Sequence, residues 1–215
     1  MSKNLKKRIY TSLALVFLMY LTLSFNSILV FSLLIISVLS LLEFFNIIKK
    51  ITKKKIYLIL FNSVFIIYVI IFSLMFFSFS NFFQLKILLF SLLFGCVASD
   101  IGGFVFGRIF KGPRLTKISP NKTISGAIGS LIFTCIIVSV SIFYFTKNFS
   151  YLILIISVMT SIGCQLGDLF FSYLKRKAKL KDTGNFLPGH GGVLDRLDGI
   201  FIGIPLGFIS IILLF

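Results

Sequence analysis

The sequence predicts an all-α protein that crosses a membrane about seven times. Hydrophobic residues make up 58% of its 215 residues, and charged residues only 13%. The mean hydropathy is +1.07. Several uncharged runs reach the length of about 18 residues or more that is needed to cross a hydrocarbon layer of about 30 Å. These runs are continuously apolar rather than alternating, which favours helices over a β-barrel.

The apolar runs predict seven spans that are joined by short polar links. Their approximate bounds are 9–25, 28–48, 56–77, 85–106, 126–145, 151–169 and 197–215. The N-terminal residues MSKNLKKR and the run after them resemble the start of a signal peptide. No small-residue cleavage site follows, so we interpret this run as an uncleaved first span. We expect residues 1–84 to form an N-terminal membrane part and residues 85–215 a catalytic membrane core, with polar loops at 107–125 and 170–196.

The basic residues predict the orientation of the spans. With the N-terminus in the cytoplasm, the segments 1–8, 49–55, 107–125 and 170–196 face the same side and hold all but two of the 22 Lys and Arg residues. This distribution satisfies the positive-inside rule at every loop. The net charge of +16 therefore indicates membrane topology rather than nucleic-acid binding. Three cysteines lie within spans without metal-type spacing, and we interpret them as packing residues: Cys96, Cys135 and Cys164.

Residues 167–199 hold most of the chain's scarce polar chemistry. They contain the only histidine and four of the six acidic residues. Two of these, Asp195 and Asp198, open the last span, whereas Asp168 and the upstream Asp100 lie about two helical turns inside their spans. A carboxylate at that depth is costly unless it is paired, hydrated or bound to a metal. The four carboxylates therefore predict a polar active-site cavity that faces the cytoplasm and holds a cation.

Asp195 and Asp198 are spaced i and i+3, on one face of a helix start. Helix capping is the alternative interpretation, because Asp is favoured in the first turn. With Asp100 and Asp168 at the same depth, we favour a divalent metal site. Oxygen ligands without convergent His or Cys favour Mg²⁺ or Mn²⁺ over zinc.

Two loops carry residues suited to phosphate groups. His190 stands among glycines, which favours a phosphate contact or an acid–base role over packing in a core. In the other loop Lys122 and Thr123 precede a glycine-rich helix start, where phosphate oxygens are favoured. The lysines of 49–55 have no such context, and we interpret them as a topology signal only. The lysines of 175–181 fit equally an interfacial helix that touches anionic lipids.

Residues 172–198, called the signature segment below, resemble the signature of the phosphatidate cytidylyltransferase family (CDP-diacylglycerol synthases). The matching positions are Ser172, Leu174-Lys175-Arg176, Lys181-Asp182, Gly184, Leu187-Pro188, His190-Gly191-Gly192-Val193 and Asp195-Arg196-Leu197-Asp198. The stretch Ser119-Pro120-x-Lys122-Thr123-x-x-Gly126 is similar to the family's second motif, and the resemblance covers about residues 95–215 closely. Family members carry an acidic residue where this chain has Phe171, and one or two further N-terminal spans. The change at Phe171 implies fewer metal ligands.

The resemblance implies an enzyme that transfers the cytidylyl group of CTP to phosphatidic acid, giving CDP-diacylglycerol and pyrophosphate, with Mg²⁺ and a second cation. The implied catalytic residues are Asp195, Asp198, His190, Lys175 and Arg176; the implied phosphate-binding residues are Ser119, Lys122, Thr123, Lys181, Arg196, Gly191 and Gly192; and the implied metal ligands are Asp168, Asp195, Asp198 and Asp100. It also implies a homodimer in the bilayer of a bacterial inner membrane, with the N-terminus and the active site on the cytoplasmic side.

Two other functions fit part of the pattern. A CTP-dependent lipid kinase, or a synthase for another lipid, would need the same metal and cationic side chains. An ion-coupled transporter would also place carboxylates in the membrane, but it should show interrupted spans near the midplane and inverted repeats. Neither is visible in the sequence, and the polar groups cluster at one interface.

Overall fold

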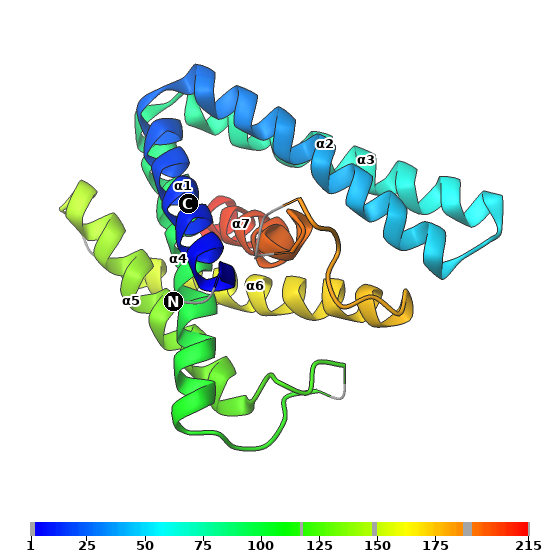
Figure 1. The fold of residues 1–215 in the computed structure, drawn as a ribbon. Helices are drawn as coiled ribbons and strands as arrows, with labels where there is room; N and C mark the ends of the chain where they lie inside the picture. Colours follow the sequence, from blue (N-terminus) through cyan, green and yellow to red (C-terminus); the bar gives the residue numbers. More distant parts are fainter. Residues whose placement is uncertain (1–2, 117, 148–149, 187–190, 215) are drawn as a thin grey trace. The chain divides into compact units, whose positions relative to one another are not determined.

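The computed structural model describes residues 3–116, 118–147, 150–186 and 191–214. The described elements are all helices: α1 (Lys3–Ser24), α2 (Asn26–Ile51), α3 (Lys55–Ser80), α4 (Phe83–Ile109), α5 (Ile124–Thr146), α6 (Tyr151–Lys177) and α7 (Leu194–Leu214) (Figure 1). Within the described residues, β pairing is confined to one isolated bridge between Arg114 and Thr123. Helices α2 to α7 are long and apolar enough to cross a membrane, and α1 adds a shorter apolar stretch, Tyr10–Ser24. The predicted class, an all-α multi-pass membrane protein, is confirmed.

The helix ends follow the local sequence. Thr123 precedes α5, and its hydroxyl oxygen accepts a hydrogen bond of 3.1 Å from the N–H of Gly126, which is a side-chain N-cap. Helix α6 runs past the predicted end of the span at 169 to Lys177. Leu, Lys and Arg at its end are good helix formers, and the basic side chains of its last turn complement the helix dipole. Helix α7 begins at Leu194, so the expected helical positions of Asp195 and Asp198 are confirmed.

The chain divides into two compact units. The first contains Met1–Asn81 and Leu174–Leu197, and the second contains Phe82–Tyr173 and Asp198–Phe215. One division, at Asn81/Phe82, lies beside the boundary expected at 84/85. The segment Leu174–Leu197, which carries most of the signature segment, belongs with the N-terminal helices. The two units are therefore described separately below.

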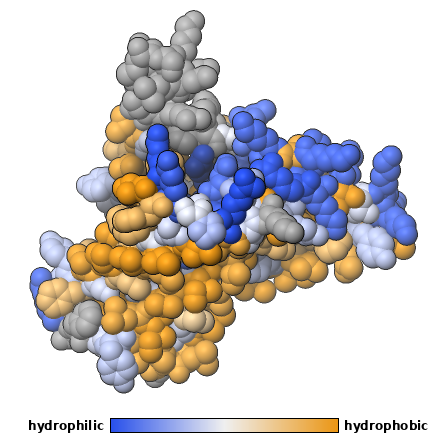
Figure 2. Space-filling model, turned by 90° about the horizontal axis from the view of Figure 1, so that it is seen from below, coloured by the Kyte–Doolittle hydropathy of each residue, from blue (hydrophilic) through white to orange (hydrophobic). Residues whose placement is uncertain are grey.

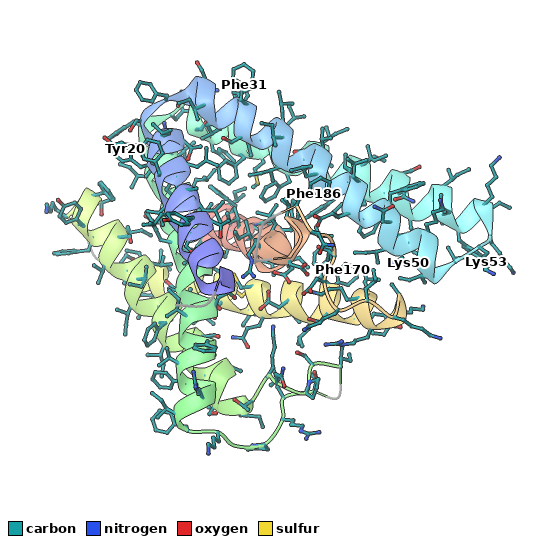
Figure 3. All side chains as sticks on the ribbon, in the orientation of Figure 1. Tyr20, Phe31, Lys50, Lys53, Phe170 and Phe186 are labelled. Carbon is teal, nitrogen blue, oxygen red and sulfur yellow. The ribbon has the colours of Figure 1, made fainter. Side chains whose placement is uncertain are left out.

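In the first unit α2 and α3 lie side by side (Figure 1). Phe44 stacks on Phe65 with ring centroids 3.9 Å apart, and the hydroxyls of Ser37 and Ser73 are 2.9 Å apart. The outward faces are apolar and exposed, as at Phe31 of α2 and Tyr20 of α1 (Figure 3). A soluble protein would bury such side chains, so these faces suit contact with lipid.

In the second unit α4 and α5 pack closely through small residues. A Cβ atom added to Gly102 would lie 2.5 Å from the carbonyl oxygen of Gly129, and one added to Gly103 would lie 2.7 Å from Ser130 Oγ. The Ser130 hydroxyl donates a hydrogen bond of 2.7 Å to the carbonyl of Ser99 across the same contact. These small residues allow the backbones of α4 and α5 to approach closely, as is typical of membrane helices.

Apolar side chains dominate the surface seen in Figure 2, and hydrophilic residues gather in limited regions of it. Many of the exposed residues are large aliphatic or aromatic side chains on the outer faces of the helices. In a hydrocarbon layer these apolar side chains avoid water, and the backbone N–H and C=O groups are hydrogen-bonded within the helices.

Candidate active site

Asp195, in the first turn of α7, is the centre of a hydrogen-bonded cluster in the first unit. Its Oδ1 accepts from Lys175 Nζ at 2.7 Å, and the two side chains are only 9% and 13% exposed. Its Oδ2 accepts from the N–H of Thr183 at 2.8 Å, the N–H of Gly192 at 3.0 Å and the Thr183 hydroxyl at 3.0 Å. A partly buried carboxylate is thus held by one cation and three neutral donors, which fixes its position and compensates its burial.

The glycines of the signature segment allow the chain to fold around this carboxylate. Gly191 has φ of +87°, which favours a residue without a side chain, and a Cβ there would lie 3.0 Å from Asp195 Oδ2. A Cβ on Gly192 would collide with the Thr183 hydroxyl and with the carboxylate of Glu43. The family resemblance implied that Gly191 and Gly192 bind a substrate phosphate. In this structure the N–H of Gly192 is bonded to Asp195.

Glu43, on α2, is a functional candidate that the analysis of the sequence missed. Its side chain is 1% exposed. Oε1 accepts from the N–H of Val193 at 2.9 Å, and Oε2 accepts from the N–H of Leu194 at 2.9 Å and from the Thr183 hydroxyl at 2.7 Å. One signal for it was present: it is the chain's only glutamate, and it lies in an apolar run, where an ionisable residue is a functional candidate by default.

A polar cavity of about 580 Å³ lies beside this cluster, also in the first unit. Its walls are the C-terminal part of α2, with Asn46, Lys49 and Lys50, and the segment 180–185, with Asp182 and Asn185. Lys53, Lys54 and Lys55 do not line it. Figure 3 shows Lys50 and Lys53 near the same end of α2. The basic run 49–55 therefore contains lysines that line the cavity and lysines that do not. Membrane topology does not distinguish them, because all of them lie in the same short run.

Lys122 pairs with a carboxylate in the second unit. Its Nζ lies 2.7 Å from Asp168 Oδ2, and the two side chains are 31% and 18% exposed. A turn orients it, because the N–H of Lys122 donates to the carbonyl of Ser119 at 3.0 Å. The neighbouring Thr123 caps α5. Ser119, Lys122 and Thr123, predicted as phosphate contacts, thus lie in one ordered turn before a helix N-terminus.

The carboxylates of Asp168 and Asp198 both flank Gly199. The N–H of Gly199 donates to Asp198 Oδ1 at 3.0 Å, and a Cβ on Gly199 would lie 3.0 Å from Asp168 Oδ1. Phe171 stands where the resemblance expects an acidic residue. Its ring is 2% exposed and lies 6.4 Å, centroid to centroid, from that of Phe201. The chain has an apolar packing residue at this position, with no carboxylate to offer a metal.

The remaining predicted residues are placed as follows. Asp100, Arg176, Lys181 and Arg196 are exposed, and His190 lies outside the described residues. Of the predicted metal ligands, Asp195 is in the first unit and the other three are in the second. Over the described residues no three acidic, His or Cys side chains form a group that could hold a metal. Mg²⁺ at nucleotide sites usually takes one or two carboxylates together with substrate phosphates, so Asp168 and Asp198 fit that ion.

The fold and these clusters define a multi-pass membrane protein whose polar loops hold carboxylates against lysines. Comparison with known proteins identifies the particular group. A family model described as "Cytidylyltransferase family" matches residues 2–214, and the chain belongs to this family.

Three curated relatives are each named phosphatidate cytidylyltransferase. The protein from Staphylococcus haemolyticus is 44% identical over 110 residues, which is 50% of this chain and 42% of the relative. The protein from Rickettsia felis is 41% identical over 133 residues (56% and 58%), and that from Helicobacter pylori 41% over 119 residues (52% and 42%). The chain thus spans about half the length of the curated relatives it matches.

Proposed function

We propose that this protein transfers the cytidylyl group of CTP to phosphatidic acid, giving CDP-diacylglycerol and pyrophosphate. The observation that carries the proposal is the cluster around Asp195. Lys175, Thr183, Gly192 and Asp195, which belong to the segment that resembles the signature of phosphatidate cytidylyltransferases, are joined there by hydrogen bonds. Membership of the cytidylyltransferase family and relatives of that name support the same reaction.

The reaction joins two anions. A phosphate oxygen of phosphatidic acid attacks the α-phosphorus of CTP, a new P–O bond forms, and the bond to the β-phosphate breaks to release pyrophosphate. A phosphate monoester is largely ionised near neutral pH, so this nucleophile needs no strong base. The protein's main task is to suppress repulsion and to stabilise charge at the transferring phosphorus. In the first unit Lys175, held at 2.7 Å from Asp195, is a positioned cation suited to that task. In the second unit Lys122 is held at the same distance from Asp168.

Mg²⁺ is the metal that this function calls for, with a second cation by resemblance to the family. We propose Asp168 and Asp198, which flank Gly199, as its protein ligands in the second unit. When bound, the ion would neutralise phosphate charge on CTP and on the departing pyrophosphate. Asp195 in the first unit already accepts four hydrogen bonds. A role for it as a ligand would require a rearrangement of at least one of these donors.

The position of the label in CTP tests the function against its main alternative. Purified protein is incubated with phosphatidic acid, Mg²⁺ and CTP labelled in the α-phosphate or in the γ-phosphate. Cytidylyl transfer carries the α label, together with cytidine, into the lipid fraction and releases the γ label as pyrophosphate. A CTP-dependent lipid kinase carries the γ label into the lipid. A lipid fraction without either label would contradict both functions.

Orientation is a further part of the proposal: the N-terminus and both polar loops face the cytoplasm of a bacterial inner membrane. Single cysteines at Thr52, Gly112 and Asn185, in a variant without the three native cysteines, should react with a membrane-impermeant reagent only from the cytoplasmic side. Cysteines at Asn81 and Lys147 should react only from outside. The reason is the distribution of basic residues, which strongly favours one orientation. Reversed labelling at any position would contradict the proposed topology.

The cavity beside α2 is the proposed place for a substrate phosphate in the first unit. A double variant Lys49→Ala/Lys50→Ala should therefore lower kcat/KM by about tenfold or more, because two cations that line a cavity are lost. The double variant Lys53→Ala/Lys54→Ala is a matched control, since it removes the same charge from the same run outside the cavity. It should cost less than about threefold at moderate salt. Equal losses would show that surface potential, and not the cavity, attracts the substrate.

A homodimer is also implied by the resemblance and stays a prediction. The mass of the purified protein in detergent, measured by light scattering with correction for bound detergent, distinguishes one chain from two.

A further inference from the structure

The buried carboxylate of Glu43 connects the N-terminal helices to the signature segment. It lies on α2, yet its three hydrogen-bond donors come from residues about 140 to 150 positions later in the chain. All of these residues belong to the first unit. Two of the donors are the N–H groups of Val193 and Leu194 at the start of α7. Such groups lack partners within their own helix and carry the positive end of its dipole. A buried anion is well compensated there.

Two glycines of the signature segment lie in close contact with the Glu43 carboxylate. A Cβ on Gly184 would lie 2.5 Å from Glu43 Oε1, and one on Gly192 would collide with Oε2. Gly184 and Gly192 both match the family signature, and both are needed to leave room for Glu43. The contact therefore lies between one side chain of α2 and the two ends of the loop that precedes α7.

Thr183 connects Glu43 to Asp195. Its hydroxyl lies 2.7 Å from Glu43 Oε2 and 3.0 Å from Asp195 Oδ2. The hydroxyl has one proton to donate, so the two carboxylates share it. The Thr183 hydroxyl is therefore a bifurcated donor that holds Asp195 Oδ2 at a fixed distance from Glu43 Oε2. The backbone N–H groups of Thr183 and Gly192, with Lys175, complete the set of donors to the Asp195 carboxylate.

We propose that Glu43 is a positioning residue of the active site, which holds the loop before α7 and, through the Thr183 hydroxyl, sets the orientation of the Asp195 carboxylate. This inference rests on the proposed cytidylyl transfer. Glu43 touches no substrate in this role. It acts on the geometry of Asp195, so its loss should lower kcat more than it changes KM for CTP.

The main test compares Glu43→Gln with Ser40→Ala. Glutamine keeps the size of the side chain but replaces one acceptor oxygen by an NH₂ group that faces N–H donors. We expect kcat to fall about tenfold to a hundredfold, while KM for CTP changes less than threefold. The backbone amides of Val193 and Leu194 should exchange hydrogen at least about tenfold faster. Ser40 is the matched control, because it is fully buried on the same helix and its hydroxyl has no hydrogen-bond partner within the described residues. Its substitution should leave kcat and exchange unchanged.

The link through Thr183 is tested by a double-mutant cycle. Thr183→Val removes the hydroxyl and keeps the shape, and Thr183→Ser restores the hydroxyl. The valine variant should lose activity and the serine variant should recover most of it. The losses from Glu43→Gln and Thr183→Val should be less than additive, because both changes break one chain of hydrogen bonds. If Glu43→Gln does not accumulate in the membrane, the activities of Thr183→Val and Thr183→Ser are compared by themselves to test the link through the Thr183 hydroxyl.

The outcomes are distinguishable. A wild-type protein that transfers no cytidylyl group contradicts the proposed function. A wild-type protein that is active, with a Glu43→Gln variant that exchanges faster but keeps its kcat within twofold, gives Glu43 a structural role only and overturns the inference. Fully additive losses, or a serine variant as slow as the valine variant, would likewise overturn it.

Discussion

Replacing Asp195 by asparagine is expected to abolish cytidylyl transfer, with kcat/KM reduced by more than about a thousandfold. The carboxylate accepts four hydrogen bonds, one of them from the Lys175 ammonium group at 2.7 Å. An amide at this position presents N–H groups to N–H donors and leaves the lysine without its counter-charge. The measurement is initial rate against CTP concentration at saturating Mg²⁺. Asp198→Asn should cause a comparable loss, because Asp198 is a proposed metal ligand.

A second substitution separates catalysis from stability. In Asp195→Asn/Lys175→Met no partly buried charge stands alone, so part of the thermal stability lost in Asp195→Asn should return. Activity should not return, because both proposed charges are missing. If the Asp195→Asn protein keeps nearly full activity, Asp195 has no catalytic role and only caps α7.

Lys122→Ala is expected to lower kcat/KM by about 30-fold or more, by the usual conversion of about 1.4 kcal/mol per decade. Lys122 lies in the turn that precedes α5 and is paired with Asp168. The pair orients the ammonium group beside a proposed metal ligand. The alanine variant therefore loses a positioned cation and also leaves Asp168 without its partner.

The Lys53→Ala/Lys54→Ala variant, measured in the same detergent and lipid mixture, is the comparison for this loss. It removes two positive charges that lie outside both lysine–carboxylate pairs and outside the cavity. A decrease of less than about threefold is expected, because exposed charges contribute little at moderate salt. Equal decreases in the two variants would remove Lys122 from the site.

The membrane spans could be predicted from the sequence because they depend on local composition. Apolar length and the positions of basic residues do not require knowledge of tertiary contacts. The helical positions of Asp195 and Asp198 followed for the same reason, from spacing at a span start. Helix α6 continues beyond the predicted end of its span at 169 to a basic last turn. Hydropathy marks where a helix leaves the apolar layer rather than where the helix ends.

The role of Glu43 could not be predicted, because its partners are mainly backbone N–H groups far along the chain. Backbone groups have no residue-type pattern. The sequence therefore marks Glu43 as an unusual residue in an apolar run, but it does not show what Glu43 contacts. The same limit applies to Lys49 and Lys50. Only the packing of segment 180–185 against α2 separates them from Lys53 and Lys54. The resemblance located the signature segment, but it did not show that this segment packs with the N-terminal helices.

That packing determines where the protein can be cut or recombined. A fragment that starts at Phe82 would contain every residue of the signature segment and of the second motif, and would look like a self-sufficient catalytic half. It would lack the carboxylate that accepts from the N–H groups of Val193 and Leu194. Chimaeras between relatives face the same constraint: an exchanged N-terminal part must bring an acidic residue at the position of Glu43 and meet small residues at those of Gly184 and Gly192.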